Sequence, residues 1–293
     1  MLFQNIIGHN QIKKNLEQAI QTDKIKHAYL FAGQEHLGKF LLACEFAKIL
    51  NQKNYTLKQI QANKVPDILV IQPEPESQNL ISIQQIRELQ RKLSLSPFES
   101  KYKIAIIDQA HFLKTEAANA LLKTLEEPLG QAVLILISFS QSALLPTIVS
   151  RCEVLKFWPV SQNQIQEKLF KQIDQNKLKK IMQIVYMRPG IAVHALSSQK
   201  FFKEQQAYIQ DWQKLSKANL VERFKYAEIL SKNNLKLRET LKAWIFYLRS
   251  ELIKKPGITL LNQLKKIQKS LNLILSSNVN QRLVLEVLML EVF

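Results

Sequence analysis

The sequence has 293 residues, of which 46% are hydrophobic and 22% charged, and no apolar run approaches the length of a membrane span. These values argue against a membrane-spanning protein and predict a globular chain of two or three domains. The two cysteines, Cys44 and Cys152, have no CxxC or metal-site spacing, so a cytoplasmic protein with free thiols is expected. The formal net charge of +17 favours a polyanionic partner such as nucleic acid, or reflects a compositional bias towards lysine.

The first part of the chain, to residue 158, alternates between short apolar runs and amphipathic segments. The apolar runs predict buried strands at residues 27–32, 67–71, 104–107, 133–137 and 153–157. The spacing of apolar residues predicts helices at 12–20, 38–50 and 117–127, and a further helix opened by an S-x-x-Q capping box at 82–85. Because continuous apolar strands alternate with helices, we expect a parallel sheet covered on both faces.

After Pro159 the pattern becomes entirely helical, with breaks at Pro189-Gly190 and Pro256-Gly257. We therefore expect three domains: an α/β domain at 1–158, a small helical domain at 159–199 and a second helical domain at 200–293. Residues 201–293 contain 16 Lys and Arg against 8 Asp and Glu, but these charges are interspersed rather than clustered.

Glycine is scarce, yet Gly33 and Gly38 stand five residues apart and Lys39 follows directly. This G-x4-G-K spacing between a predicted strand and a predicted helix is typical of a loop whose amides and lysine hold nucleotide phosphates. A working loop continues with Ser or Thr, because a hydroxyl there binds Mg²⁺. Phe40 occupies that position, so we predict a phosphate-loop fold without ATPase activity; the alternative is an ordinary strand-to-helix turn.

A second nucleotide-site motif ends the predicted strand at 104–107. Asp108 would lie at the carboxyl edge of the sheet, where it could bind Mg²⁺ or, equally, cap a turn. An active ATPase would continue with a Glu that activates water, whereas Gln109 has no useful basicity. We expect His111 to be structural, since no second metal ligand is spaced to join it.

Arg151 follows Ser150 between two predicted strands, where its guanidinium could reach another molecule. An arginine supplied in trans stabilises the charge on a transferring phosphoryl group and typically raises the rate by about 10³–10⁵-fold. A structural ion pair is the alternative for an isolated Ser-Arg pair. Together with the two defective nucleotide motifs, the position favours the in-trans role.

Several segments together resemble the bacterial clamp-loader AAA+ ATPases. They are the phosphate loop at 33–39, Pro66-Asp67, DQAH at 108–111, AANALLKTLEEP at 117–128 and LPTIVSRC at 145–152. The run at 117–128 is long and highly specific, and the resemblance covers roughly the first 160 residues. It implies an AAA+ P-loop domain with a parallel sheet, followed by a small helical lid domain and an all-helical collar domain.

Within this family the chain resembles the delta-prime type of subunit more than the gamma/tau motor type. A motor subunit would be expected to keep Ser or Thr after Lys39 and Glu after Asp108, whereas a delta-prime subunit has a defective site and an intact Ser-Arg-Cys. The resemblance implies a vestigial nucleotide site, with no cofactor required, at Gly33, Gly38, Lys39 and Asp108. Arg151, with Ser150, would act on the ATP of an adjacent motor subunit.

The resemblance also implies partners. The collar would join a five-membered ring with gamma/tau-type motor subunits and a delta subunit. That complex would open the sliding clamp and place it on primer-template DNA, with no role for a membrane.

Three departures from the family pattern concern the nucleotide site and metal binding. Residues 51–64 lack the four-cysteine zinc module that many relatives carry, so no zinc is predicted. The polar sensor-one residue would be Ser138 or Ser140, although either hydroxyl could simply bond backbone at the end of a strand. Val193 stands where an active subunit would carry the sensor-two arginine.

Two other functions stay open at the level of sequence. An active gamma/tau-type motor would need another metal ligand and another base to replace Phe40 and Gln109. A stand-alone basic DNA-binding protein would need a clustered basic face. The apolar run at 283–290 fits either the core of the last domain or a subunit interface.

Overall fold

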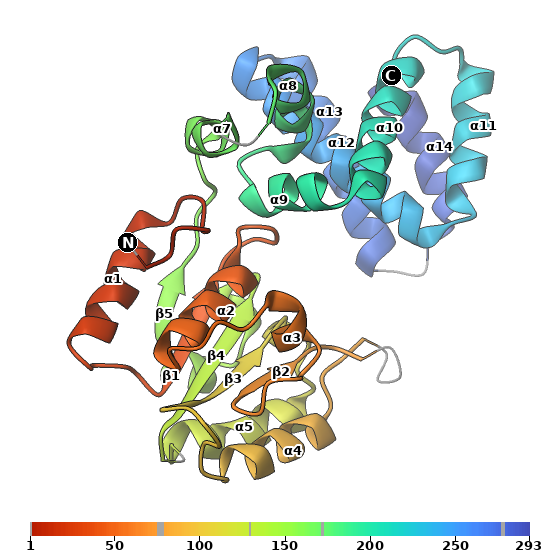
Figure 1. Cartoon of the computed structure of the whole chain (residues 1–293). Coiled ribbons are helices and arrows are strands. Elements are labelled where there is room, and N and C mark those ends of the chain that lie inside the picture. The colour runs from red at the N-terminus through yellow and green to blue at the C-terminus, as the bar shows by residue number, and fades with distance from the viewer. Residues whose placement is uncertain (1, 75–78, 129, 171–172, 277–278) are drawn as a thin grey trace. The chain divides into compact units, whose positions relative to one another are not determined.

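The computed structural model describes residues 2–74, 79–128, 130–170, 173–276 and 279–293 (Figure 1). The chain divides into two compact units, Met1–Ser161 and Gln162–Phe293. The first unit is α/β, and the second is built from helices. The further division of the second unit into a lid and a collar stays a prediction. In the described part of the chain, no helix is both long and apolar enough to cross a membrane.

A five-stranded parallel sheet forms the centre of the first unit. Its strands are β1 (Ala28–Ala32), β2 (Ile68–Ile71), β3 (Lys103–Ile107), β4 (Ala132–Ser138) and β5 (Glu153–Lys156). The strand order is β2-β3-β4-β1-β5, and every neighbouring pair is parallel. All five predicted strands are therefore confirmed. Apart from Lys103 at the start of β3 and Ser138 at the end of β4, the central strands β3, β4 and β1 are apolar, as expected for strands buried on both faces.

Helices cover both faces of this sheet, as predicted (Figure 1). One face carries α1 (Asn10–Gln21), α2 (Lys39–Leu50) and α3 (Leu57–Gln61), and the other carries α4 (Ile83–Leu93) and α5 (Thr115–Glu126). Successive strand residues alternate between the two cores: Phe31 packs with α2, and Leu30 packs with α5. Three short turns complete the unit: η2 (Ala110–Phe112), η3 (Gln141–Ala143) and α6 (Pro146–Val149).

The outer side of edge strand β2 is occupied by a side chain that follows α3. The Asn63 amide nitrogen donates to the Val70 carbonyl at 2.9 Å, and the Asn63 oxygen accepts from the Val70 N–H at 2.7 Å. The Asn63 side-chain amide thus forms the two hydrogen bonds that the backbone of a further strand would form with Val70. Both backbone groups of Val70 therefore have a partner.

The second unit has its own core. Its helices are α7 (Gln162–Phe170), α8 (Gln175–Val185), α9 (Pro189–Ser197), α10 (Gln199–Leu215), α11 (Leu220–Ser231), α12 (Asn234–Lys254), α13 (Ile258–Ser276) and α14 (Gln281–Val292). Trp244 lies at the centre, fully buried, and its indole N–H donates to the Tyr208 carbonyl at 2.8 Å. Trp212 and Phe293 pack against it. The predicted break at Pro256-Gly257 is confirmed, whereas Pro189-Gly190 opens α9 and the break lies just before it, at residues 186–188.

The apolar run at 283–290 lies in α14 and has two distinct faces. Leu285, Leu288 and Met289 are buried in the core of the helical unit. Their neighbours Leu283, Val287 and Leu290 are 59%, 46% and 57% exposed. One face of α14 is therefore part of the core, which was the first of the two alternatives for this run. The other face forms an apolar stripe on the surface.

Candidate functional site

The loop at 33–39 joins β1 to α2, as predicted for a phosphate loop. Gly33 donates its N–H to the Ser138 carbonyl at 3.1 Å, and a Cβ added to Gly33 would lie only 2.4 Å from the Phe157 carbonyl oxygen. Gly38 precedes α2 with φ 88°, a left-handed conformation that glycine adopts without strain. Both glycines are thus required by the backbone itself.

Lys39 folds back onto its own loop. Its ammonium donates to the carbonyl oxygens of Gly33 and Gln34, each at 2.5 Å, and the residue is buried. His36 also has a left-handed backbone, with φ 62°, which costs energy for a residue other than glycine. The Lys39 ammonium would have to break its hydrogen bonds to both carbonyl oxygens before it could bind a phosphate group.

Phe40, which follows Lys39, and Gln109, which follows Asp108, offer no catalytic groups. The Phe40 side chain packs against the core beneath α2, so it supplies no metal ligand. Gln109 is exposed and has φ 54°, and its amide cannot act as a base. This set of donors does not fit a hydrolysable magnesium–nucleotide complex.

Asp108 lies at the end of β3, at the carboxyl edge of the sheet. Its carboxylate accepts from the Gln72 side-chain amide at 3.2 Å and from the Gln109 backbone N–H at 2.9 Å. Burial raises the pKa of Asp108, and these two donors with the charge of Lys39 oppose the shift only in part. The fold therefore brings Asp108 and Lys39 into one site, where Asp108 also caps the turn that follows it.

The other polar residues named near this edge are engaged locally. The Ser138 hydroxyl donates to the Ser140 carbonyl at 2.8 Å, and the Ser140 hydroxyl accepts from the Ser142 N–H at 3.2 Å. Both serines thus bond backbone at the end of β4, which agrees with the simpler alternative for them. His111 packs edge-on against Phe139 at 4.7 Å, and burial lowers its pKa, so the ring is neutral at pH 7.

Arg151 lies just after α6, and its guanidinium is held by two segments. Nη1 donates to the Thr147 carbonyl at 2.9 Å, and Nη2 forms an ion pair with Oε1 of Glu126 at 2.7 Å. The Ser150 hydroxyl donates to the same Thr147 carbonyl at 3.1 Å. Glu126 ends α5, far from Arg151 in sequence, and nothing in its local sequence indicated this contact.

Neither cysteine has the chemistry of a reactive thiol. Both are free, and burial raises the pKa of Cys44 and of Cys152 to about 12. Among the residues that the structure describes, no group of three or more His, Cys, Asp or Glu side chains could hold a metal ion.

The sheet, the phosphate loop and the LPTIVSRC turn agree with one protein family. The family model described as DNA polymerase III, delta subunit, matches residues 8–161, slightly more than half of the chain. The chain belongs to this family. The match ends at the residue where the α/β unit ends. The chain is thus a clamp-loader-type AAA+ protein.

Curated relatives of this clamp-loader protein are DNA polymerase III subunits. The tau subunit of Bacillus subtilis (strain 168) is 32% identical over 186 residues, 60% of this chain and 32% of the relative. The delta' subunit of the same strain is 34% identical over 171 residues, 55% of this chain and 51% of the relative. The chain thus spans about a third to a half of these two relatives. The names support a role in DNA replication.

The fold of the clamp-loader protein is also found in a solved structure. A DNA polymerase III gamma subunit-related protein from Thermotoga maritima matches with a TM-score of 0.56 and 19% identity, covering 95% of this chain and 99% of that one. At this identity the likeness concerns the fold alone, and it confirms the predicted AAA+ architecture.

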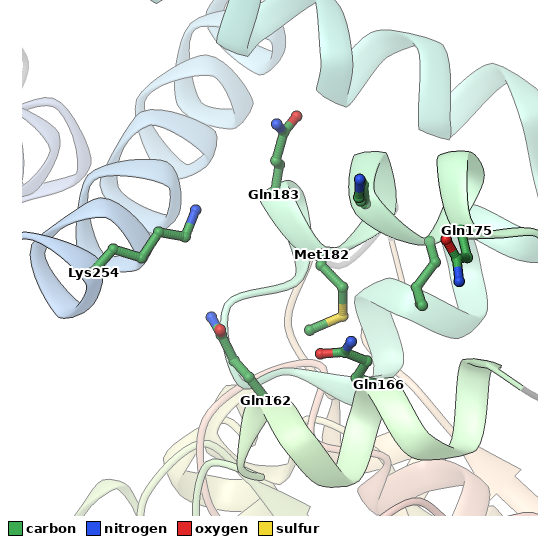
Figure 2. A pocket seen from close by; sticks show the side chains of 8 residues that line it. Gln162, Gln166, Gln175, Met182, Gln183 and Lys254 are labelled. Atoms are coloured by element: carbon green, nitrogen blue, oxygen red, sulfur yellow. The ribbon is translucent and has the colours of Figure 1, made fainter.

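A pocket of about 530 Å³ lies in the helical unit of the clamp-loader protein, and none of the predicted site residues lines it (Figure 2). Its polar lining consists of Gln162, Gln166, Gln175, Gln183, Lys179 and Lys254. None of the lining side chains is a carboxylate, an imidazole or a thiol, and Lys254 is paired with Glu251 at 2.8 Å. The pocket therefore offers Lys179 and Lys254 no carboxylate, imidazole or thiol with which to form an acid–base pair.

Proposed function

We propose that this chain is a delta-prime-type clamp-loader subunit, which hydrolyses no ATP itself and supplies Arg151 to the ATP site of an adjacent motor subunit. The observation that carries the proposal is that Phe40 follows Lys39 and packs against the core, where a working site has a hydroxyl that binds Mg²⁺. Gln109 likewise follows Asp108, where a working site has a carboxylate that activates water. These two positions therefore offer no oxygen ligand for the metal and no base for the water.

Arg151 suits an action on another molecule. Its side chain is 35% exposed, and a guanidinium presents a planar fork of donors that matches phosphate oxygens. Ser150, which precedes it, helps to shape the turn. The partners in this proposal are gamma/tau-type motor subunits and a delta subunit, and through the complex the sliding clamp and primer-template DNA. The positive net charge favours contacts with DNA phosphates.

In the same proposal, the helical unit has two roles. Helices α7 to α9 form the lid, and α10 to α14 form the collar that joins the ring. The separate core around Trp244 supports a collar that is stable in its own right.

The proposal is tested by ATP turnover of the clamp loader reconstituted with its motor and delta subunits on primed DNA. Arg151→Ala should slow the site that Arg151 serves by about 10³-fold, while the isolated wild-type chain should be inactive. Arg151→Lys should restore little, because an ammonium cannot form the planar fork. Normal turnover with Arg151→Ala would contradict the in-trans role, and the chain would then have only a scaffolding role in the complex.

The gamma/tau motor is the second candidate, because the tau relative matches at nearly the same identity as the delta' relative. It predicts turnover by the isolated chain that Lys39→Ala abolishes. Turnover of that kind would replace our proposal.

A further inference from the structure

We infer that Glu126 is the residue that positions Arg151 for the neighbouring subunit's ATP. This inference rests on the function proposed above. Glu126 is the last residue of α5, and Oε1 of its carboxylate lies 2.7 Å from Nη2 of Arg151. It is a positioning residue, since it touches Arg151 and not the nucleotide.

The guanidinium keeps donors for a phosphate while it is held. Nη1 faces the Thr147 carbonyl at 2.9 Å and the Ser150 hydroxyl at 3.4 Å, and Nη2 faces Glu126. A guanidinium has five N–H groups, so these contacts leave one on Nε and one on Nη2. An arginine held this way can therefore bind phosphate oxygens without first losing its present partners.

Glu126 differs from the other two partners because it lies on a different element. Thr147 and Ser150 belong to the same turn as Arg151, which the buried Ile148 anchors in the core. Glu126 ends α5, whose Leu121 and Leu125 are buried in the same core. Among the described contacts of the guanidinium, the Glu126 carboxylate is therefore the one that holds it from outside its own turn. Without it, a long and half-exposed side chain would sample many rotamers, and misplacement is costly in catalysis.

The ion pair contributes little to folding, which makes it testable. Both side chains are substantially exposed, at 35% and 48%, and pairs of that kind add little stability. We therefore expect Glu126→Ala to fold normally and to affect turnover alone. Glu127→Ala is the matched control, because Glu127 is the next residue, is exposed and forms no ion pair with the described residues.

The experiment measures ATP turnover of the reconstituted complex on primed DNA across a range of ATP concentrations. Glu126→Ala should lower the maximal rate at the site served by Arg151 by roughly 5- to 50-fold, with little change in the ATP concentration needed for half the maximal rate. Glu126→Gln should lose less, because its amide oxygen still accepts from Nη2. Glu127→Ala should match the wild type.

The double variant Glu126→Ala/Arg151→Ala separates positioning from a general structural effect. It should be no slower than Arg151→Ala alone, because Glu126 acts only through Arg151. Additive losses, an increased rate with Glu126→Ala, or equal rates for Glu126→Ala and Glu127→Ala would overturn the inference while Arg151 keeps its role. Normal turnover with Arg151→Ala would overturn the proposed function and this inference together.

Discussion

At the scale of one residue, burial changes the pKa of Asp108 at the carboxyl edge of the sheet. Because burial raises its pKa, the ionised carboxylate is disfavoured in the folded chain, and Asp108 costs stability once the pH exceeds its ordinary value of 3.8. We expect Asp108→Asn to raise the melting temperature at pH 7 by about 2 °C, and the gain to shrink as the pH falls towards 4. Thermal unfolding of the isolated chain, followed by circular dichroism, measures both.

The control for this prediction is Glu127→Gln, which removes an exposed carboxylate without a partner among the described residues. It should change the melting temperature by much less at either pH. A lower melting temperature for Asp108→Asn at pH 7 would mean that the bond from Gln72 stabilises the carboxylate more than burial disfavours it.

At the scale of the element, Asp67 attaches the loop before β3 to the start of β2. The residue is 2% exposed, and it accepts from the N–H groups of Phe98 at 2.8 Å and Glu99 at 3.0 Å. Burial would raise its pKa, but these amides and the Lys103 charge together lower it. The Pro-Asp motif that marks the family is thus structural in this chain.

Asp67→Ala should lower the free energy of unfolding by about 2–4 kcal/mol, because two backbone amides lose a charged acceptor and the buried Lys103 loses its ion-pair partner. Since the pKa of Asp67 is lowered, its contribution is present above the ordinary value of 3.8 and is lost as the pH falls through the folded value. Urea unfolding at pH 7 and at a series of pH values below 3.8 checks this; a deficit that does not shrink below pH 3.8 would show that the charge is irrelevant.

The elements differ in how well the sequence alone predicts them. Strands β1 to β4 were predictable because burial on both faces leaves an almost unbroken apolar run. Helix α3 was not, because it is five residues long and buries only Ile60. The Glu126–Arg151 pair was not, since it depends on the packing of α5 beside α6 and not on any local pattern. The two glycines and Lys39 were predicted as a loop, but the spacing alone did not indicate that the Lys39 ammonium would donate to carbonyls of that same loop.

At the scale of the whole molecule, α14 serves the core of the helical unit and also presents an apolar stripe to the outside. The sequence alone could not show which residues of α14 are buried and which are exposed, because both faces are apolar. Leu285→Ala should reduce the free energy of unfolding by about 2–5 kcal/mol, whereas Val287→Ser should change it by less than about 0.5 kcal/mol. Fluorescence of the buried Trp212 and Trp244 during urea unfolding reports on this unit when Trp158 of the first unit is replaced by Phe.

The stripe itself is expected to matter only in the assembled ring, because exposed apolar surface of this kind is typical of protein interfaces. Val287→Ser should therefore weaken association with the partner subunits in gel filtration, although the isolated chain is as stable as the wild type. Unchanged assembly would place the collar interface on other helices.

The Asn63–Val70 pairing has a further consequence, for solubility in the crowded cell. A parallel sheet ends in two open edges, and an open edge can recruit a strand from another chain and start an aggregate. At β5 the edge is short and carries the exposed charges of Glu153 and Lys156. At β2 the strand is purely apolar, and the side-chain amide of Asn63 takes the place that an intruding strand would need. The side chain of Asn63 thus protects the β2 edge from pairing with a strand of another chain.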